Sequence, residues 1–191
     1  MVRLIISLIG HPASGKTSTA KYLERKYGFT VFTFSQVIRD YAARNDIQLK
    51  RRADYANTHT RMLKEHGWDY TLKLALSSNT GRLCVDDVRS PRFAEVLREA
   101  GSVDIAFVCP AAVRFAHAQG NADMARYPDT EKVFIENERE DNGVVIGPGL
   151  EFDTDWVMQT APYHIDASGT LDNTYRQLDK IVTTLIAKDT T

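Results

Sequence analysis

Short apolar runs alternate with longer stretches of helical periodicity along this chain of 191 residues. Four runs, residues 3–9, 30–34, 82–88 and 103–109, are largely apolar and favour strands, and residues 163–166 form a shorter fifth. Runs of this kind, without strict alternation of polar and apolar residues, are typical of strands buried in a parallel sheet. The alternation of strand and helix predicts the α/β class, built on a five-stranded parallel sheet.

The segments between the runs have helical spacing and recognisable ends. Ala20, Leu23 and Tyr27 fall on one helical face, and Gly28 stands where that helix would end. Ser35 is placed to cap a second helix that reaches about residue 45. Further helices are expected over residues 55–65 and 69–76, from Pro91 to Gly101, after Pro110, over 130–140, and from Thr170 onwards. Residues 141–149 carry three glycines and a proline and are expected to form a mobile loop.

The second and third runs are separated by about forty residues of helical pattern, longer than a usual crossover between parallel strands. We interpret residues 35–78 as an inserted helical arm that binds a substrate. The sequence has neither internal repeats nor low-complexity linkers, so residues 1–191 are expected to form a single domain.

The composition is that of a globular protein, with 43% hydrophobic and 26% charged residues. The formal net charge of -1 gives no overall positive field that would attract nucleic acid or a membrane surface. The sequence has no stretch long enough for a transmembrane helix, and its apolar N-terminus is too short for a signal peptide. Cys84 and Cys109 fall in apolar runs and are expected to be reduced core residues. These features predict a cytoplasmic protein.

Residues 10–17 complete the phosphate-loop motif G-x-x-x-x-G-K-[ST], directly after the first run and before the first helix. Its glycines let successive backbone N–H groups point into one concavity at a helix N-terminus, which binds anions. Lys16 is expected to reach the β- and γ-phosphates of a nucleotide, and the Thr17 hydroxyl to ligate Mg²⁺. The residues expected to bind the nucleotide are Gly10, Pro12, Ala13, Ser14, Gly15, Lys16, Thr17 and Ser18.

Two aspartates lie in the third run, near its carboxyl end. Asp86 and Asp87 stand at its carboxyl end, where open α/β sheets bind ligands, and in this topology they lie beside the phosphate loop. One of them, Asp86 in our assignment, is expected to hold Mg²⁺, and either can accept a proton from an acceptor hydroxyl. The alternative is a structural pair that caps the next turn. Arg89 and Arg92 come next, and their guanidinium groups suit an acceptor phosphate, although Arg92 also fits a solvated position at a helix start.

The arm carries further polar and basic residues. Ser35, Arg39 and Arg61 are expected to bind the substrate, because Ser35 and Arg39 come just after the second run and Arg61 extends the basic character of the arm. The cluster Lys50–Arg52 fits a solvated face and a ligand contact equally well.

The region after the fourth run contains Arg114, Arg126 and Arg139. An arginine that closes over the transferring phosphoryl group would stabilise its charge in the transition state. Arg114 and Arg139 are our candidates for that role. The residues expected to act in catalysis are therefore Lys16, Asp86, Asp87, Arg89, Arg114 and Arg139.

The histidines are weak catalytic candidates. His59, His66 and His117 fall on expected helices and are interpreted as surface or satisfied residues. His11 occupies a position of the phosphate loop that tolerates many residues. The sequence contains neither a His/Cys spacing typical of zinc sites nor a recognisable Ser-His-Asp arrangement.

The chain resembles the nucleoside monophosphate kinase-like superfamily of P-loop kinases, and within it the small dephospho-CoA and deoxynucleoside monophosphate kinases. The resemblance rests on the phosphate loop and on residues 34–39, 85–91, 109–114, 138–140 and 163–171. It implies a P-loop three-layer α/β/α fold, ATP and Mg²⁺ as cofactors, an acceptor arm over residues 35–78, a lid region over 114–139, and residues 167–169 near the adenine. Relatives often have a glycine where this chain has Asp87, so either Asp86 or Asp87 can be the functional carboxylate.

These features together predict an ATP-dependent kinase for a small nucleotide-type acceptor, such as a (deoxy)nucleoside monophosphate or a dephospho-CoA-like molecule. One alternative acceptor is a modified nucleotide within DNA, which the Lys50–Arg52 cluster permits and the net charge does not favour. Another alternative is a regulatory ATPase that hydrolyses ATP without an acceptor, because P-loop scaffolds support many reactions.

Overall fold

The computed structural model describes residues 4–50, 52–77, 81–120, 128, 130–147 and 150–189. It contains the strands and helices expected from the sequence and three short elements that were not expected. In chain order the elements are β1 (Leu4–Ile9), α1 (Lys16–Tyr27), β2 (Thr30–Thr33), α2 (Phe34–Arg44), α3 (Arg52–His66), α4 (Tyr70–Ser77), β3 (Arg82–Asp86), α5 (Pro91–Glu99), β4 (Ser102–Val108), α6 (Ala111–Gln119), α7 (Glu131–Asp141), β5 (Val145–Gly147), β6 (Leu150–Glu151), α8 (Thr154–Gln159), β7 (Tyr163–Asp166) and α9 (Leu171–Asp189).

The main sheet has five parallel strands in the order β2-β3-β1-β4-β7, which confirms the predicted five-stranded parallel sheet. The first strand lies at its centre, with Leu8 in register with Asp86 of β3 and with Ile105 of β4. Parallel strands all end at the same edge of the sheet, so the loop after β1 and the two aspartates at the end of β3 are neighbours.

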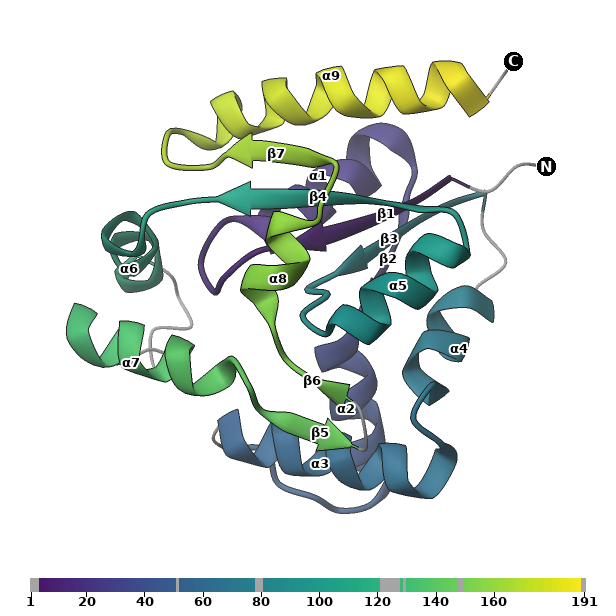
Figure 1. Cartoon of the computed structure of the whole chain (residues 1–191), viewed down its shortest axis with the longest axis vertical. Helices are drawn as coiled ribbons and strands as arrows, with labels where there is room; N and C mark the ends of the chain where they lie inside the picture. Colours follow the sequence, from purple (N-terminus) through teal and green to yellow (C-terminus); the bar gives the residue numbers. More distant parts are fainter. Residues whose placement is uncertain are drawn as a thin grey trace.

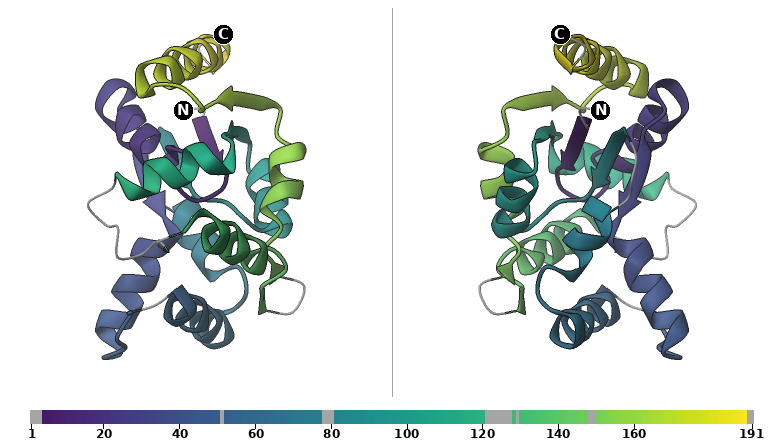
Figure 2. Two further views of the ribbon diagram at one scale, coloured as in Figure 1. Left: turned by 90° about the vertical axis from the view of Figure 1, so that its left-hand side faces the viewer. Right: turned by 90° about the vertical axis from the view of Figure 1, so that its right-hand side faces the viewer.

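Helices cover both faces of this sheet, as the three-layer prediction requires (Figure 1 and Figure 2). Ile5 and Ile9 of β1 pack in a core with α5 and α8, whereas Ile6 and Leu8 pack in a second core with α1 and α9. Strand β1 is apolar at nearly every position because its side chains enter two different cores. This burial on both faces explains why the strand runs lack polar alternation.

The arm is formed by α2, α3 and α4, and Figure 1 shows α2 and α3 below the main sheet. Its own small core contains Ile38, Tyr41 and Met62. The prediction that Ser35 caps α2 is wrong, because the helix already begins at Phe34 and Thr33 is its N-cap residue. Phe34 is buried and stacks on Phe93 of α5, which fixes the start of the helix two residues earlier.

The three unexpected elements follow α7. Residues 145–147, within the segment expected to be a mobile loop, form β5, which pairs antiparallel with β6. Ile146 and Leu150 of this hairpin are buried in the same core as α5. The strands are too short to produce a periodic pattern, so they could not be recognised from the sequence. Helix α8 has a readable start, since the Asp153 side chain accepts a hydrogen bond from the Trp156 backbone N–H at 2.9 Å.

Two expectations from composition can be compared with the structure. Cys84 and Cys109 are free and buried, as predicted. Among the described residues, the helices are all too short or too polar to cross a membrane.

Candidate functional site

The phosphate loop connects β1 to α1 and depends on both of its glycines. A side chain at Gly10 would come within 2.9 Å of the Ser14 hydroxyl and 3.1 Å of the Phe107 carbonyl oxygen. Gly15, immediately before α1, has φ 89°, a conformation that side-chain-bearing residues rarely adopt. The loop is thus closely packed at its start and left-handed at its end, which lets it curl around an anion.

Lys16 occupies the centre of this loop. Its ammonium group donates to the carbonyl oxygens of Gly10 (2.6 Å) and His11 (2.8 Å) and lies 3.4 Å from the Ser14 hydroxyl. The residue as a whole is 6% exposed. Burial lowers the pKa of Lys16, while the charges of Asp87 and Asp86 oppose that shift. The cation is therefore held within the loop in position to meet a phosphate.

Asp86 lies against the first turn of α1. Its Oδ2 accepts a hydrogen bond from the Thr17 hydroxyl at 3.1 Å, and the residue is 4% exposed. Burial, followed by repulsion from Asp87, raises the pKa of Asp86 to about 6. Its buried Oδ1 has no hydrogen-bond partner among the described residues. A hydroxyl and a carboxylate with an unused oxygen form a donor set that fits Mg²⁺.

Asp87 faces the other side of the loop. Its Oδ1 lies 3.4 Å from the Lys16 ammonium, and its Oδ2 accepts two bonds from Arg89, at 2.8 Å from Nε and 2.6 Å from Nη2. Burial works against ionisation, but Arg89 and Lys16 together hold the pKa of Asp87 below its usual range. Asp87 has φ 71°, a left-handed backbone conformation that costs a residue with a side chain about 1–3 kcal/mol.

Arg89 is placed in the site mainly by acidic residues. Besides Asp87, its Nη1 lies 3.6 Å from Asp141 at the end of α7. The structure thus brings Lys16, Asp86, Asp87 and Arg89 together at the carboxyl ends of β1 and β3, as the sequence predicted for their position.

The two lid candidates occupy different positions. Arg114 is buried, donates to the carbonyl oxygens of Cys109 (2.9 Å) and Pro12 (3.3 Å), and pairs with both carboxylate oxygens of Glu138. Arg139 is exposed and lines a hollow along α7 with Glu131, Lys132, Ile135 and Glu136. Successive helical residues point about 100° apart, so Glu138 faces Arg114 and Arg139 does not. Arg126, the third arginine of this region, lies outside the described residues.

The arm arginines form local pairs. Arg39 is half-buried and donates to the Gln36 side chain at 3.0 and 3.3 Å, and Arg61 is exposed and pairs with Glu65 at 2.9 Å. Ser35 is exposed in the first turn of α2. Arg51, in the centre of the basic cluster, lies outside the described residues.

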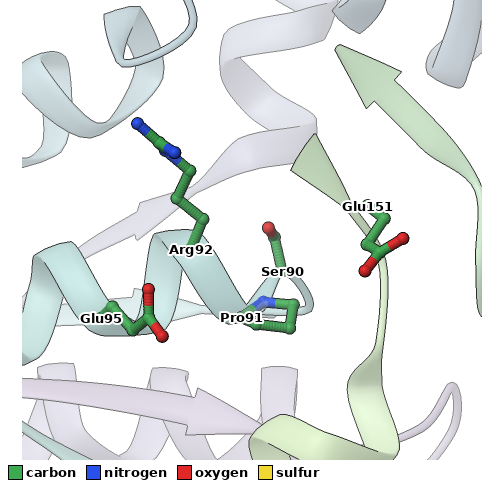
Figure 3. A pocket seen from close by; sticks show the side chains of 5 residues that line it. All are labelled: Ser90, Pro91, Arg92, Glu95 and Glu151. Carbon is green, nitrogen blue, oxygen red and sulfur yellow. The ribbon is translucent and has the colours of Figure 1, made fainter. Parts of the chain in front are cut away.

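A cavity of about 230 Å³ opens beside the N-terminus of α5 and is lined by Ser90, Pro91, Arg92, Glu95 and Glu151 (Figure 3). The Arg92 guanidinium lies 4.1 Å from the centre of the Trp68 ring. Ser90 is the N-cap residue of α5, as expected, but its buried hydroxyl has no partner among the described residues. Buried polar atoms are nearly always paired, so this hydroxyl is available to a ligand.

His59 differs from its prediction, and His11 makes contacts that the sequence did not predict. His59 is buried against Phe93, and burial lowers its pKa to about 4. His11 lies between two carboxylates, with Nδ1 2.9 Å from Glu138 and Nε2 2.8 Å from Asp155. Sequence reasoning missed this group because its members are far apart along the chain. The available signal was Glu138, in the string 138–140 that resembled the kinases.

Comparison with known proteins gives a family and distant relatives. The AAA domain family matches residues 6–141. A cytidylate kinase of Methanocella arvoryzae is 47% identical over 47 residues, which are 25% of this chain and 27% of that protein. A UPF0200/UPF0201 protein of Archaeoglobus fulgidus is 24% identical over 93% of this chain and 54% of its own length, so the chain spans about half of it. A UPF0200 protein of Pyrococcus horikoshii is 25% identical over 96% of this chain and 98% of its own.

Solved structures share the fold at low identity. A shikimate kinase of Acinetobacter baumannii, in complex with shikimate, has a TM-score of 0.60 and 12% identity over 97% of this chain and 94% of its own. A gluconokinase of Sinorhizobium meliloti has a TM-score of 0.54 and 14% identity over 97% of both chains. At these identities the likeness describes the arrangement of strands and helices.

Proposed function

The chain belongs to the AAA domain family, and from that premise we propose that it is an ATP-dependent phosphotransferase for a small nucleotide-type acceptor. The observation that carries the proposal is the buried Lys16 ammonium inside a complete phosphate loop, with Asp86, Asp87 and Arg89 grouped beside it. Phosphoryl transfer depends on positioned charge more than on covalent chemistry, and this group supplies both signs of charge. The short stretch of identity to a cytidylate kinase supports a nucleotide as the acceptor.

Different residues of the site bind the two substrates, ATP and the acceptor. The loop backbone and Lys16 bind the β- and γ-phosphates of ATP, while Thr17 and Asp86 are the residues that would hold Mg²⁺. When bound, the ion would neutralise charge on the phosphate oxygens. Asp87 is the carboxylate that faces the acceptor, because 34% of its side chain is exposed whereas Asp86 is almost fully buried.

The acceptor lies on the arm side of the loop in this proposal. Arg89 and Asp87 orient its attacking oxygen, and the cavity at Ser90 and Arg92 receives a more distant part of the molecule. Residues 35–78 form the acceptor-binding arm, with Ser35, Arg39 and Arg61 on its surface, and residues 114–139 form the lid. The free cysteines favour a reducing compartment, in agreement with a cytoplasmic location.

Replacing Arg39 with alanine is expected to raise the acceptor KM about tenfold and to leave kcat within about twofold. Among the described residues, Arg39 donates hydrogen bonds only to the neutral side chain of Gln36, so its charge is available to the acceptor. Steady-state kinetics with varied acceptor and saturating ATP measure the effect. Arg44→Ala, on the last turn of the same helix, is the matched control and should leave KM unchanged. An unaltered KM in Arg39→Ala would remove this residue from the acceptor site.

The acceptor is identified by phosphoryl transfer from ATP–Mg²⁺ to a panel of molecules. The panel contains ribo- and deoxynucleoside monophosphates, dephospho-CoA and a single-stranded oligonucleotide. One acceptor turned over at about 1 per second or faster would lie in the ordinary range for kinases and would support the proposal. Preference for the oligonucleotide, with strong salt dependence, would instead indicate a polynucleotide substrate. Transfer to none of these small acceptors would count against the proposed substrate class.

A further inference from the structure

The side chain of His11 contacts a carboxylate through each of its ring nitrogens. Its Nδ1 lies 2.9 Å from Glu138 Oε1 on α7, and its Nε2 lies 2.8 Å from Asp155 Oδ1 on α8. An ionised carboxylate only accepts hydrogen bonds, so a ring nitrogen that pairs with one must donate. The imidazolium, with a proton on each nitrogen, is the form of histidine that can donate to two carboxylates at once.

Glu138 is well suited to hold this cation. Burial disfavours its ionised form, but the hydrogen bonds from His11 and Arg114 prevail and lower the pKa of Glu138 to about 2. The carboxylate is thus ionised throughout the neutral range. It contacts the His11 ring on the loop and the Arg114 guanidinium on α6.

Both carboxylates are connected to the rest of the fold. Arg114, paired with Glu138, also donates to the Pro12 carbonyl oxygen, which belongs to the next residue of the loop. Asp155 accepts a hydrogen bond from the Asn142 side-chain amide at 2.8 Å, and Asn142 in turn accepts one from the Thr154 backbone N–H at 3.2 Å. The contacts of His11 thus link the phosphate loop to α7 and α8.

Two other titratable side chains at the loop contact its backbone and not the His11 ring. Lys16 of α1 donates to the His11 backbone carbonyl and not to its side chain. His117 of α6 meets the loop at the Ala13 carbonyl oxygen, 3.2 Å from its Nδ1. The ring of His11 therefore points outward from the loop, toward Glu138 and Asp155, while its backbone faces the phosphate-binding lysine.

We propose that His11 is a positioning residue whose imidazolium fixes the phosphate loop against α7 and α8 and thereby sets the affinity for nucleotide. The name His11 clamp is used here for His11, Glu138 and Asp155. The clamp rests on the proposed nucleotide-binding function, since the loop must hold its backbone N–H groups in a converging arrangement to bind phosphates. When the contacts of His11 with Glu138 and Asp155 are broken, part of the free energy of nucleotide binding is used to order the phosphate loop.

Nucleotide affinity tests the clamp without requiring an acceptor. We expect His11→Gln to bind ADP about tenfold more weakly than the unmodified protein, because glutamine cannot supply a positive charge to two carboxylates. Asp155→Asn, at an exposed position, should weaken binding less and should leave folding intact. In the double variant the two losses should not add, because both break the same contact. The matched control is His164→Gln, whose ring contacts the Met158 carbonyl oxygen away from the loop.

The charge of the ring is tested separately by nitrogen NMR at pH 7. Both ring nitrogens of His11 should be protonated, with the signals assigned from their loss in His11→Gln. A bare nitrogen on His11, ADP affinity unchanged in His11→Gln, or fully additive losses in the double variant would each overturn the clamp. Failure of the unmodified protein to bind ADP at all would contradict the proposed function, and the NMR result would still decide the protonation of His11.

Discussion

Lys16→Ala is expected to reduce phosphoryl transfer about a thousandfold, and the protein should remain folded. The ammonium of Lys16 is buried and donates hydrogen bonds to the carbonyl oxygens of Gly10 and His11 in the loop. Alanine leaves the backbone N–H groups in place but removes the charge that would bind the β- and γ-phosphates. The measurement is kcat/KM for ATP, with the melting temperature recorded for the same samples.

Folding should survive because Lys16 contributes polar contacts rather than core packing. Burial lowers the pKa of Lys16, which means that the fold disfavours its charge, and alanine relieves that cost. Lys21→Ala, on an exposed position of the same helix, is the matched control and should keep full activity. Comparable activity in Lys16→Ala and Lys21→Ala would show that this loop is not the catalytic phosphate site.

Asp86→Asn is expected to lower kcat by about a hundredfold or more and to make the unliganded protein more stable. The substitution removes the carboxylate that, with Thr17, would hold Mg²⁺, so the Mg²⁺ concentration needed for half-maximal activity should also rise. The control is Asp104→Asn, which replaces another buried aspartate. Asp104 lies in β4 and pairs with Arg98 of α5 at 2.7 Å, and the variant protein should keep its phosphoryl-transfer activity.

The stabilisation follows from the pKa of Asp86, which is about 6 in the folded protein against an ordinary 3.8. Below pH 3.8 the group is protonated in both states and has no effect. As pH rises toward 6, the unfolded chain releases the proton first, so the free energy of unfolding falls by up to about 3 kcal/mol. An asparagine side chain does not titrate, and Asp86→Asn should therefore be more stable than the unmodified protein by about 1–3 kcal/mol above pH 6. Urea unfolding at pH 4 and pH 7.5 measures this difference, and equal stability at both pH values would contradict it.

The parts of the fold that could be predicted are those with local signals. The resemblance to P-loop kinases and the five-stranded parallel sheet are confirmed, because the strand before the loop is apolar on both faces and the loop motif is contiguous. The hairpin of β5 and β6 has too few residues for a periodic pattern, and Ile146 and Leu150 anchor it by burial in the core that also contains residues of α3 and α5. The start of α2 is set by packing between Phe34 and Phe93, which lie far apart in the sequence.

In the candidate site too, features with a local sequence signal could be predicted and features set by distant contacts could not. Asp86 and Asp87 could be placed beside the loop because strand ends converge in a parallel sheet. The left-handed backbone of Asp87 could not be read from the sequence, since aspartate gives no such signal as glycine does. The pairing of His11 with Glu138 and Asp155 joins residues from distant parts of the chain, so it depends on how α7 and α8 dock on the loop.

The central claim, that this loop transfers phosphate to an acceptor, is tested most directly by the fate of the γ-phosphoryl group of labelled ATP. With a suitable nucleotide-type acceptor, the label should appear mainly in the phosphorylated acceptor, at a rate that depends on acceptor concentration and is lost in Lys16→Ala. Release of the label as inorganic phosphate, at one rate whatever acceptor is present, would contradict the claim and would identify a nucleotide hydrolase.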